Sequence, residues 1–250
     1  MKVALVVNQI TEDVDSNLKS ISKLIQQVDS CDLVLLPEAA ITGLINNDTP
    51  KYDLLLGQPI PGQITNQLGL IASKNSINIV IGMLEREEKR LYDTAIFITS
   101  DGQISLKYRR ITSGWHGKNV DSRIYRQGNE IPVLETKFGR FAILICGDLF
   151  EEELIEKIKE LEPDWLLFPF ARSFDDNSWN QERWDKEEKY KYTEQVRKAG
   201  VTTFMVNYLG NEKMNDYSFG GAIVVSKDGN IISDFPLGKE GILFIELRVS

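Results

Sequence analysis

The opening segment of the chain, residues 2–37, constrains the fold more than any other part of the sequence. Residues 2–8 and 32–37 are near-continuous apolar runs of strand length, and the apolar residues of 15–28 recur at helical spacing. Strands that are apolar on both faces are typical of sheets whose faces are covered by helices. This β-α-β pattern therefore predicts an α/β fold in which helices cover a sheet.

The rest of the chain continues in the same manner and shows no internal repeat. The remaining predicted elements are a helix at 63–75, a strand at 77–84, a hairpin at 92–99 and 104–110, a hairpin at 133–138 and 141–145, a helix at 151–161, a strand at 164–170, a helix at 179–198, a strand at 201–208, a hairpin at 220–225 and 231–235, and a closing strand at 243–249. Residues 112–130 are polar and poorly periodic, which predicts a long functional loop. Because both ends carry core-like strands, we expect one domain over residues 1–250.

One cysteine stands at a position typical of a nucleophile. The apolar run 141–145 ends at Cys146 and Gly147, and helical spacing begins at residue 151. A thiol at such a strand-to-helix junction lies near backbone amides and a helix N-terminus, which favour negative charge. The alternative is a cysteine that simply packs in the core, as unpaired cysteines commonly do.

Composition excludes several classes of partner. The net charge is −8 and the densest basic run, residues 107–110, is short, so we expect neither nucleic acid nor an anionic membrane as a partner. Two cysteines, Cys31 and Cys146, and an opening without a signal-like segment predict a cytoplasmic protein. His116 is the only histidine, so an ordinary Cys/His zinc site is not expected, and we predict no metal or cofactor.

Three short motifs follow one another in a particular order along the chain. Glu38 follows Leu-Pro at the end of a predicted strand, a Lys-Tyr-Arg-Arg run ends at Arg110, and an Ile-Cys-Gly-Asp run contains Cys146. In this order and spacing the sequence resembles the nitrilase-type carbon-nitrogen hydrolases over essentially its whole length. The resemblance implies a four-layer α-β-β-α sandwich and a Glu-Lys-Cys triad whose thiol attacks an amide, carbamoyl or nitrile carbon.

The resemblance assigns a role to each of the three residues. Glu38 takes the place of the general base, Cys146 that of the nucleophile, and Arg110 that of the family's lysine. A base is needed because a free thiol is only a few per cent ionised near pH 7. Arginine keeps the positive charge that stabilises a thiolate and an oxyanion, but its longer, forked side chain is not interchangeable with lysine.

Other residues near these motifs have alternative interpretations. Lys107 is a second candidate for the missing lysine, although strand alternation places positions 107 and 110 on opposite faces. The family's second glutamate corresponds to Lys118, so that carboxylate is absent unless Asp121 or another loop residue replaces it. Asp148 also matches the family, and we expect it to hold the turn around Cys146.

Four further residues, in or near the long loop and at the end of a predicted strand, each allow two interpretations. Arg172, at the end of the 164–170 strand, either binds a substrate carboxylate or forms a salt bridge with an acidic residue. Trp115, His116 and Tyr125 either line a pocket or pin the long loop to the protein.

The sequence thus predicts a cofactor-free hydrolase that cleaves a non-peptide carbon-nitrogen bond of a small molecule through an acyl-enzyme on Cys146. Amides and carbamoyl groups are favoured over nitriles because amide hydrolysis is the commoner activity that the resemblance implies. The rival hypothesis is a catalytically impaired scaffold that binds a small molecule or a partner. The resemblance also implies a homodimer or larger assembly, joined through the helices near 151–161 and 179–198.

Overall fold

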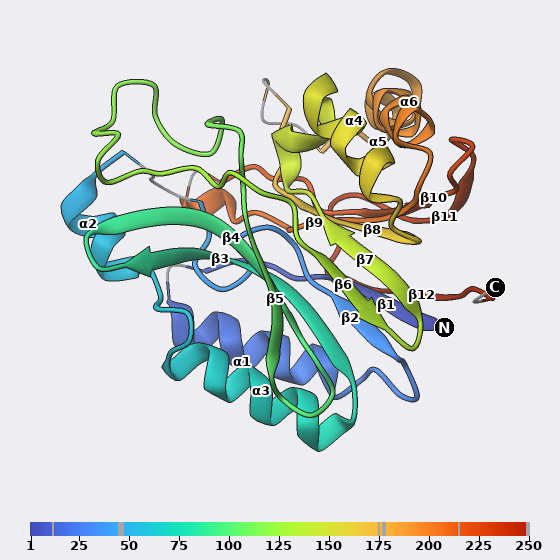
Figure 1. The fold of residues 1–250 in the computed structure, drawn as a ribbon. Coiled ribbons are helices and arrows are strands. Elements are labelled where there is room, and N and C mark those ends of the chain that lie inside the picture. The colour runs from blue at the N-terminus through green and yellow to red at the C-terminus, as the bar shows by residue number, and fades with distance from the viewer. Residues whose placement is uncertain (12, 45–47, 175, 177–178, 215, 249–250) are drawn as a thin grey trace.

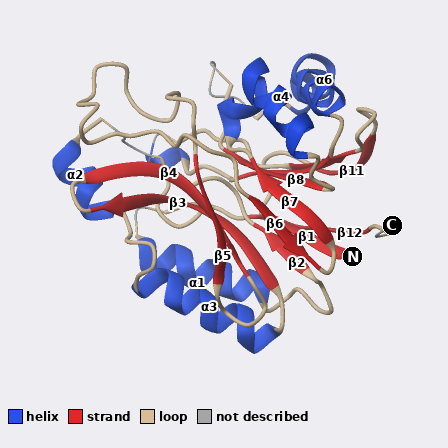
Figure 2. Ribbon diagram, in the orientation of Figure 1, coloured by secondary structure: helices blue, strands red, loops and turns tan. Residues whose placement is uncertain are grey.

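Two six-stranded sheets lie face to face, and helices cover the outer side of each (Figure 1). The computed structural model describes residues 1–11, 13–44, 48–174, 176, 179–214 and 216–248. The first sheet has the order β12-β1-β2-β3-β4-β5, and the second has the order β11-β10-β9-β8-β7-β6. The helices lie outside the paired sheets, as Figure 2 shows by colour. The predicted four-layer α-β-β-α sandwich is therefore confirmed.

The strands of the first sheet are β1 (Lys2–Val7), β2 (Leu33–Leu35), β3 (Asn78–Glu87), β4 (Arg90–Ile98), β5 (Ile104–Arg109) and β12 (Gly241–Glu246). Those of the second are β6 (Val133–Thr136), β7 (Gly139–Ile143), β8 (Trp165–Phe170), β9 (Thr202–Asn207), β10 (Ala222–Val225) and β11 (Ile231–Phe235). The central strands β1, β2 and β3 run parallel to one another, as do β7, β8 and β9. Both sheets therefore present the carboxyl ends of parallel strands, the place where α/β proteins build their sites.

The helices cover the sheets with their apolar faces. Helices α1 (Val14–Ile25) and α3 (Gln63–Asn75) cover the first sheet, and α4 (Glu152–Leu161) and α6 (Lys189–Ala199) cover the second (Figure 1). In α1 the buried residues include Leu18, Ile21 and Ile25, which share one face of the helix. No helix among the described residues has the length and apolar character needed to cross a membrane.

The core fills the space between the two sheets. Phe97 of β4 and Phe141 of β7 meet across this space with ring centroids 5.6 Å apart, in a tilted arrangement. A second apolar cluster lies between the first sheet and helices α1 and α3, which is why β1 is buried on both faces. Burial on both faces explains why the sequence of this strand is continuously apolar instead of alternating.

The structure differs from the predicted elements in a few places. Helix α2 (Pro50–Leu56) was not predicted, because this short segment buries only Asp53 and Leu56 and shows little apolar periodicity. The predicted helix at 179–198 is divided into α5 (Gln181–Arg183), a π-turn at Trp184–Glu188 and α6. The closing strand ends at Glu246, and the predicted end at residue 249 lies outside the described residues.

The long loop at 112–130 has no helix or strand of its own, as predicted. It is held at one end of the sandwich because the Tyr125 hydroxyl donates a short hydrogen bond to Asp53 of α2. Trp115 packs with Leu84 and Leu91 of the first sheet. The loop is thereby fixed above the strand ends that carry Glu38 and Cys146.

Candidate active site

A cavity of about 340 Å³ opens at the carboxyl ends of the parallel strands. Glu38, Arg110 and Cys146 all line it, together with Trp115 and His116 of the long loop. Glu38 follows β2 and Cys146 follows β7, so the two residues come from different sheets. We refer to this space as the Cys146 cavity. The fold thus brings together the three residues that the sequence singled out.

Cys146 is held in an uncommon backbone conformation at the start of a short 3-10 helix, Cys146–Phe150. Its φ angle is 46°, in the left-handed region that costs a non-glycine residue of order 1–3 kcal/mol. Strain of this kind is often found where a side chain must be presented at a functional site. The Sγ atom lies 3.7 Å from the carbonyl oxygen of Ala171, which follows β8.

Asp148 holds the turn around Cys146. Its Oδ2 atom accepts hydrogen bonds from the Tyr108 hydroxyl at 2.6 Å and from the Ile145 backbone N–H at 3.2 Å. Its Oδ1 atom accepts one from the Thr112 backbone N–H at 2.8 Å. Asp148 therefore ties the turn around Cys146 to β5 and to the start of the long loop, and the predicted turn-holding role is confirmed.

The Arg110 side chain points into the same cavity as Cys146 and is almost fully buried, with 4% of its surface exposed. Its Nη1 atom donates a hydrogen bond to Glu38 Oε1 at 2.9 Å and lies 3.6 Å from Asp93 Oδ2. Its Nε atom donates to Thr112 Oγ1 at 2.8 Å. A buried cation so close to a carboxylate and beside Cys146 provides the positive charge that the triad chemistry requires.

Lys107 lies on the opposite face of β5 and does not reach this cavity. Its Nζ atom binds Glu85 Oε1 at 2.8 Å, and Arg109 binds the same carboxylate. Positions 107 and 109 therefore face one side and 110 the other, as strand alternation predicts. The structure excludes Lys107 as the cation beside Cys146.

Asp93 of β4 is a buried carboxylate at the site that the sequence analysis missed. Only 1% of its surface is exposed, and the Arg110 backbone N–H donates to its carbonyl oxygen at 2.8 Å. Burial, followed by the negative charge of Glu38, raises the pKa of Asp93 well above its usual value, and Arg110 opposes the shift. The sequence signal that could have revealed Asp93 is a single charged residue inside the mostly apolar run 91–98.

Asp121, proposed as a replacement carboxylate, instead pairs with Arg123 at 2.7 Å.

Glu38 is fully buried, and this burial sets its protonation behaviour. Desolvation raises its pKa to about 8, and a negative charge on Cys146 acts in the same direction, whereas Arg110 opposes both. The thiol of Cys146 therefore lies close to the Glu38 carboxyl group. A carboxyl group with a pKa in this range can both accept and return a proton near neutral pH.

The other candidate residues divide between the cavity and the scaffold. Trp115 and His116 line the cavity, while Tyr125 pins the loop. The His116 ring nitrogens contact the Gly117 carbonyl oxygen at 2.9 Å and the Gln127 side-chain nitrogen at 2.8 Å, which leaves neither for Cys146. Arg172 forms a salt bridge with Glu188 at 3.3 Å, so the second of its two readings is confirmed.

The charge of the Cys146 cavity is not balanced by a free cation. Among the described residues that line it, Arg110 is the only lysine or arginine, and this residue is already paired with Glu38. Asp216 adds a second lining carboxylate, whose Oδ1 atom accepts from the Ser218 backbone N–H at 3.1 Å. Its Oδ2 atom accepts no hydrogen bond within the described part of the chain. The cavity is therefore better suited to neutral or cationic groups than to an anion.

The four-layer sandwich and the meeting of Glu38, Arg110 and Cys146 at its strand ends define the class: this is a nitrilase-type protein. The chain belongs to the carbon-nitrogen hydrolase family, whose model matches residues 2–250.

Relatives of known class agree with this assignment. The chain is 26% identical over 239 residues to a probable nitrilase of Schizosaccharomyces pombe, covering 92% of this chain and 82% of that protein. It is 24% identical to a deaminated glutathione amidase of Dictyostelium discoideum, covering 95% of this chain and 84% of that protein.

Solved structures show the same fold. An amidase from Nesterenkonia sp. AN1, in which acrylamide has added to the active-site cysteine, aligns with a TM-score of 0.80 at 18% identity and covers 99% of this chain and 93% of that one. Nit3 of Saccharomyces cerevisiae aligns with a TM-score of 0.78 at 20% identity and covers 98% of this chain and 89% of that one.

Proposed function

We propose that this protein hydrolyses the amide carbon-nitrogen bond of a small neutral or cationic molecule through an acyl-enzyme on Cys146. The observation that carries the proposal is the meeting of Glu38, Arg110 and Cys146 in one cavity, with Arg110 bonded to Glu38 at 2.9 Å. The probable nitrilase and the amidases among its relatives are consistent with this class of reaction.

The first half of the reaction forms a thioester. Glu38 accepts the thiol proton of Cys146, and the sulfur attacks the carbonyl carbon so that a carbon-sulfur bond forms and the carbonyl oxygen becomes negative. Arg110 and the backbone amide after Cys146 stabilise this oxyanion. Glu38 then returns the proton to the leaving nitrogen, the carbon-nitrogen bond breaks, and ammonia or an amine departs.

The second half consumes one water molecule. Glu38 accepts a proton from water as its oxygen attacks the thioester carbon, and the carbon-sulfur bond breaks. The proton returns to the sulfur, which restores the thiol and releases the carboxylic acid. Glu38 acts on both halves, and its raised pKa suits both directions of transfer.

A panel of small amides of similar size and different charge tests the proposal and its substrate class. We expect pentanamide and 4-aminobutanamide to release ammonia and to leave an acyl mass on Cys146, and succinamate to react roughly tenfold or more slowly, because a buried anion would meet Asp216 without a free cation. The measurement is kcat/KM by ammonia release, with intact mass after a rapid quench.

Matched variants locate the origin of this charge preference. Asp216→Asn should narrow the difference between the cationic and anionic amides, whereas Glu212→Gln, which removes a charge from an exposed position of the same segment, should not. If no member of the panel yields ammonia or an adduct, the proposed hydrolysis is wrong. That result would favour the alternative hypothesis of a catalytically impaired binding scaffold. If succinamate reacts fastest, only the substrate class is wrong.

The two thiols should differ in reactivity. Burial and the neighbouring charge of Asp32 raise the pKa of Cys31, whereas Cys146 lies beside the guanidinium of Arg110. We expect stoichiometric iodoacetamide at pH 7.5 to label Cys146 about tenfold faster or more. Peptide mapping by mass spectrometry measures the two rates, and faster labelling of Cys31 would contradict the assignment of Cys146 as the nucleophile.

The quaternary state and the compartment remain predictions. The homodimer or larger assembly is proposed through the helices α4 and α6, which form the outer layer over the second sheet (Figure 1). The cytoplasmic location rests on the sequence alone.

A further inference from the structure

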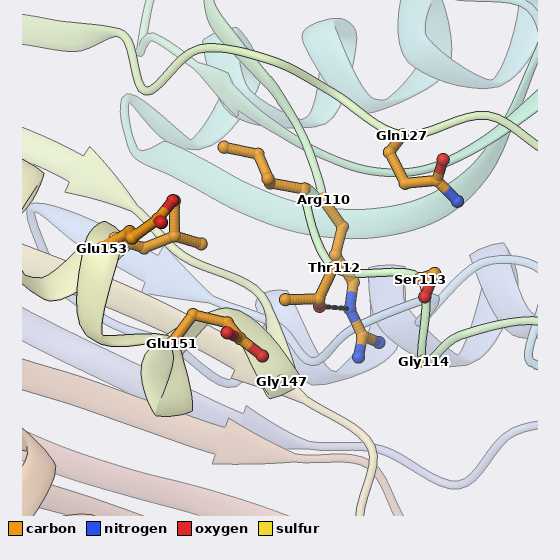
Figure 3. Close-up of a pocket in the computed structure, with 10 residues that line it drawn as sticks. Arg110, Thr112, Ser113, Gly114, Gln127, Gly147, Glu151 and Glu153 are labelled. Carbon is orange, nitrogen blue, oxygen red and sulfur yellow. Dashed lines mark hydrogen bonds between the residues drawn. The ribbon is translucent and has the colours of Figure 1, made fainter.

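Two of the three nitrogen atoms of the Arg110 guanidinium are held by hydrogen bonds to different parts of the fold. Nε donates to Thr112 Oγ1, and Nη1 donates to Glu38 and lies near Asp93. Nη2 makes no hydrogen bond to the described residues and lies between two glycines, Gly114 and Gly147 (Figure 3). Two hydrogen bonds therefore fix the guanidinium, and its third nitrogen, Nη2, points to the turn that carries Cys146.

Glycine is needed at positions 114 and 147 because a larger residue would crowd the tip of Arg110. Neither has a positive φ angle, so the backbone itself does not require glycine at these positions. A Cβ atom on Gly147 would lie 2.7 Å from Arg110 Nη2 and 3.0 Å from Thr112 Oγ1, and one on Gly114 would lie 3.1 Å from Nη2. The arginine tip is flexible in principle, but it cannot withdraw here without losing its bonds to Thr112 and Glu38.

A neighbouring cavity of about 570 Å³ shares this corner of the molecule. It is lined by Arg110, Thr112, Gly114 and Gly147, and it shares Arg110 and Gly114 with the Cys146 cavity. Figure 3 shows the Arg110 side chain reaching past Thr112 toward Gly147 at the edge of this space. The guanidinium therefore stands in the wall between two cavities, where a shorter side chain would leave a gap.

We propose that Gly147 and Thr112 are positioning residues that, with Asp93, form a seat shaped for a guanidinium, so that arginine at position 110 is the working cation of this site. The proposal rests on the hydrolysis proposed above. A lysine ammonium is a single nitrogen, so it cannot occupy the three separate positions that Nε, Nη1 and Nη2 hold beside Thr112, Glu38 and Gly147. The seat therefore distinguishes an enzyme adapted to arginine from a scaffold that has lost its lysine.

A double-mutant cycle between positions 110 and 147 tests this seat. Gly147→Ala should lower kcat/KM on the order of a hundredfold in the Arg110 background, because a displacement of about 1 Å has effects of that size. In an Arg110→Lys background Gly147→Ala should lower kcat/KM by less than about threefold, because the contact with Nη2 is gone. Arg110→Lys alone should also lower kcat/KM, since the Thr112 bond is lost.

Thr112 provides the matched control. Thr112→Val removes the acceptor for Nε with little change in volume and should lower kcat/KM on the order of tenfold, whereas Thr112→Ser keeps the hydroxyl and should retain most of the rate. Thermal unfolding of every variant identifies any that fail to fold. A failed fold for Gly147→Ala alone, with Gly147→Ala/Arg110→Lys folded, would still report the same coupling between the two positions.

A second measurement does not depend on turnover. The rate of iodoacetamide alkylation at Cys146, measured at pH 7.5, should fall by about tenfold in Gly147→Ala and remain nearly unchanged when the same substitution is made with Arg110→Lys. Equal effects of Gly147→Ala in both backgrounds, or a faster enzyme with Arg110→Lys alone, would overturn the seat. If no amide is hydrolysed, the proposed function fails while the alkylation series still decides the seat.

Discussion

Cys146→Ala is expected to lower kcat/KM on the best amide by a factor on the order of 10⁴ or more. Without the thiol no thioester forms, and the remaining cavity offers only binding and oxyanion stabilisation. The acyl mass seen by rapid quench should disappear together with the turnover. Ammonia release and intact mass measure the two effects on the same samples.

Cys31→Ala is the matched control for this loss. Cys31 lies outside the Cys146 cavity, beside Asp32, and its removal should leave kcat/KM within about twofold. An alanine at position 146 that kept a tenth of the rate would show that the thiol is not the nucleophile. A loss of the same size in Cys31→Ala would show that the assay reports fold integrity instead of chemistry.

Glu38→Gln should lower kcat/KM on the order of a thousandfold, because glutamine keeps the shape of the side chain but can neither take nor return a proton. The pH dependence carries a second signature. Burial raises the pKa of Glu38 to about 8, so the carboxylate that acts as base is present above this value and is lost as pH falls. The rate should therefore rise with pH through about 8, and this limb should be absent in the variant.

Asp93→Asn separates the two buried carboxylates. Asp93 faces Glu38 and Arg110. The negative charge of Glu38 raises the pKa of Asp93, whereas a hydrogen bond from the Asp93 side chain lowers the pKa of Glu38. Because the amide keeps a neutral hydrogen-bond donor beside Glu38, Asp93→Asn should leave the acid limb near its wild-type pH and keep most of the activity above it. An acid limb that persists in Glu38→Gln would assign the titration to another group.

The sequence by itself determined the layers of this protein and the three motif residues of its site. Continuous apolar strands and amphipathic helices are local patterns, so β1, α1 and α3 could be recognised without knowing their neighbours. Strand alternation also separated Lys107 from Arg110 correctly, since facing is fixed by the pleat of a single strand. The Ile-Cys-Gly-Asp run indicates Cys146 as the candidate nucleophile because its order and spacing relative to Glu38 and Arg110 resemble those of the family.

Only the tertiary structure decided which residues meet those three. Asp93 faces Glu38 from a strand that is far away in the sequence, and Asp216 reaches the same cavity from beyond β9. In the sequence Gly147 only marks the end of an apolar run, and its contact with the tip of Arg110 becomes visible only when β5 and the turn around Cys146 are placed side by side. Local pattern specifies the backbone of each element, whereas the partners of a buried charge depend on how separate elements pack.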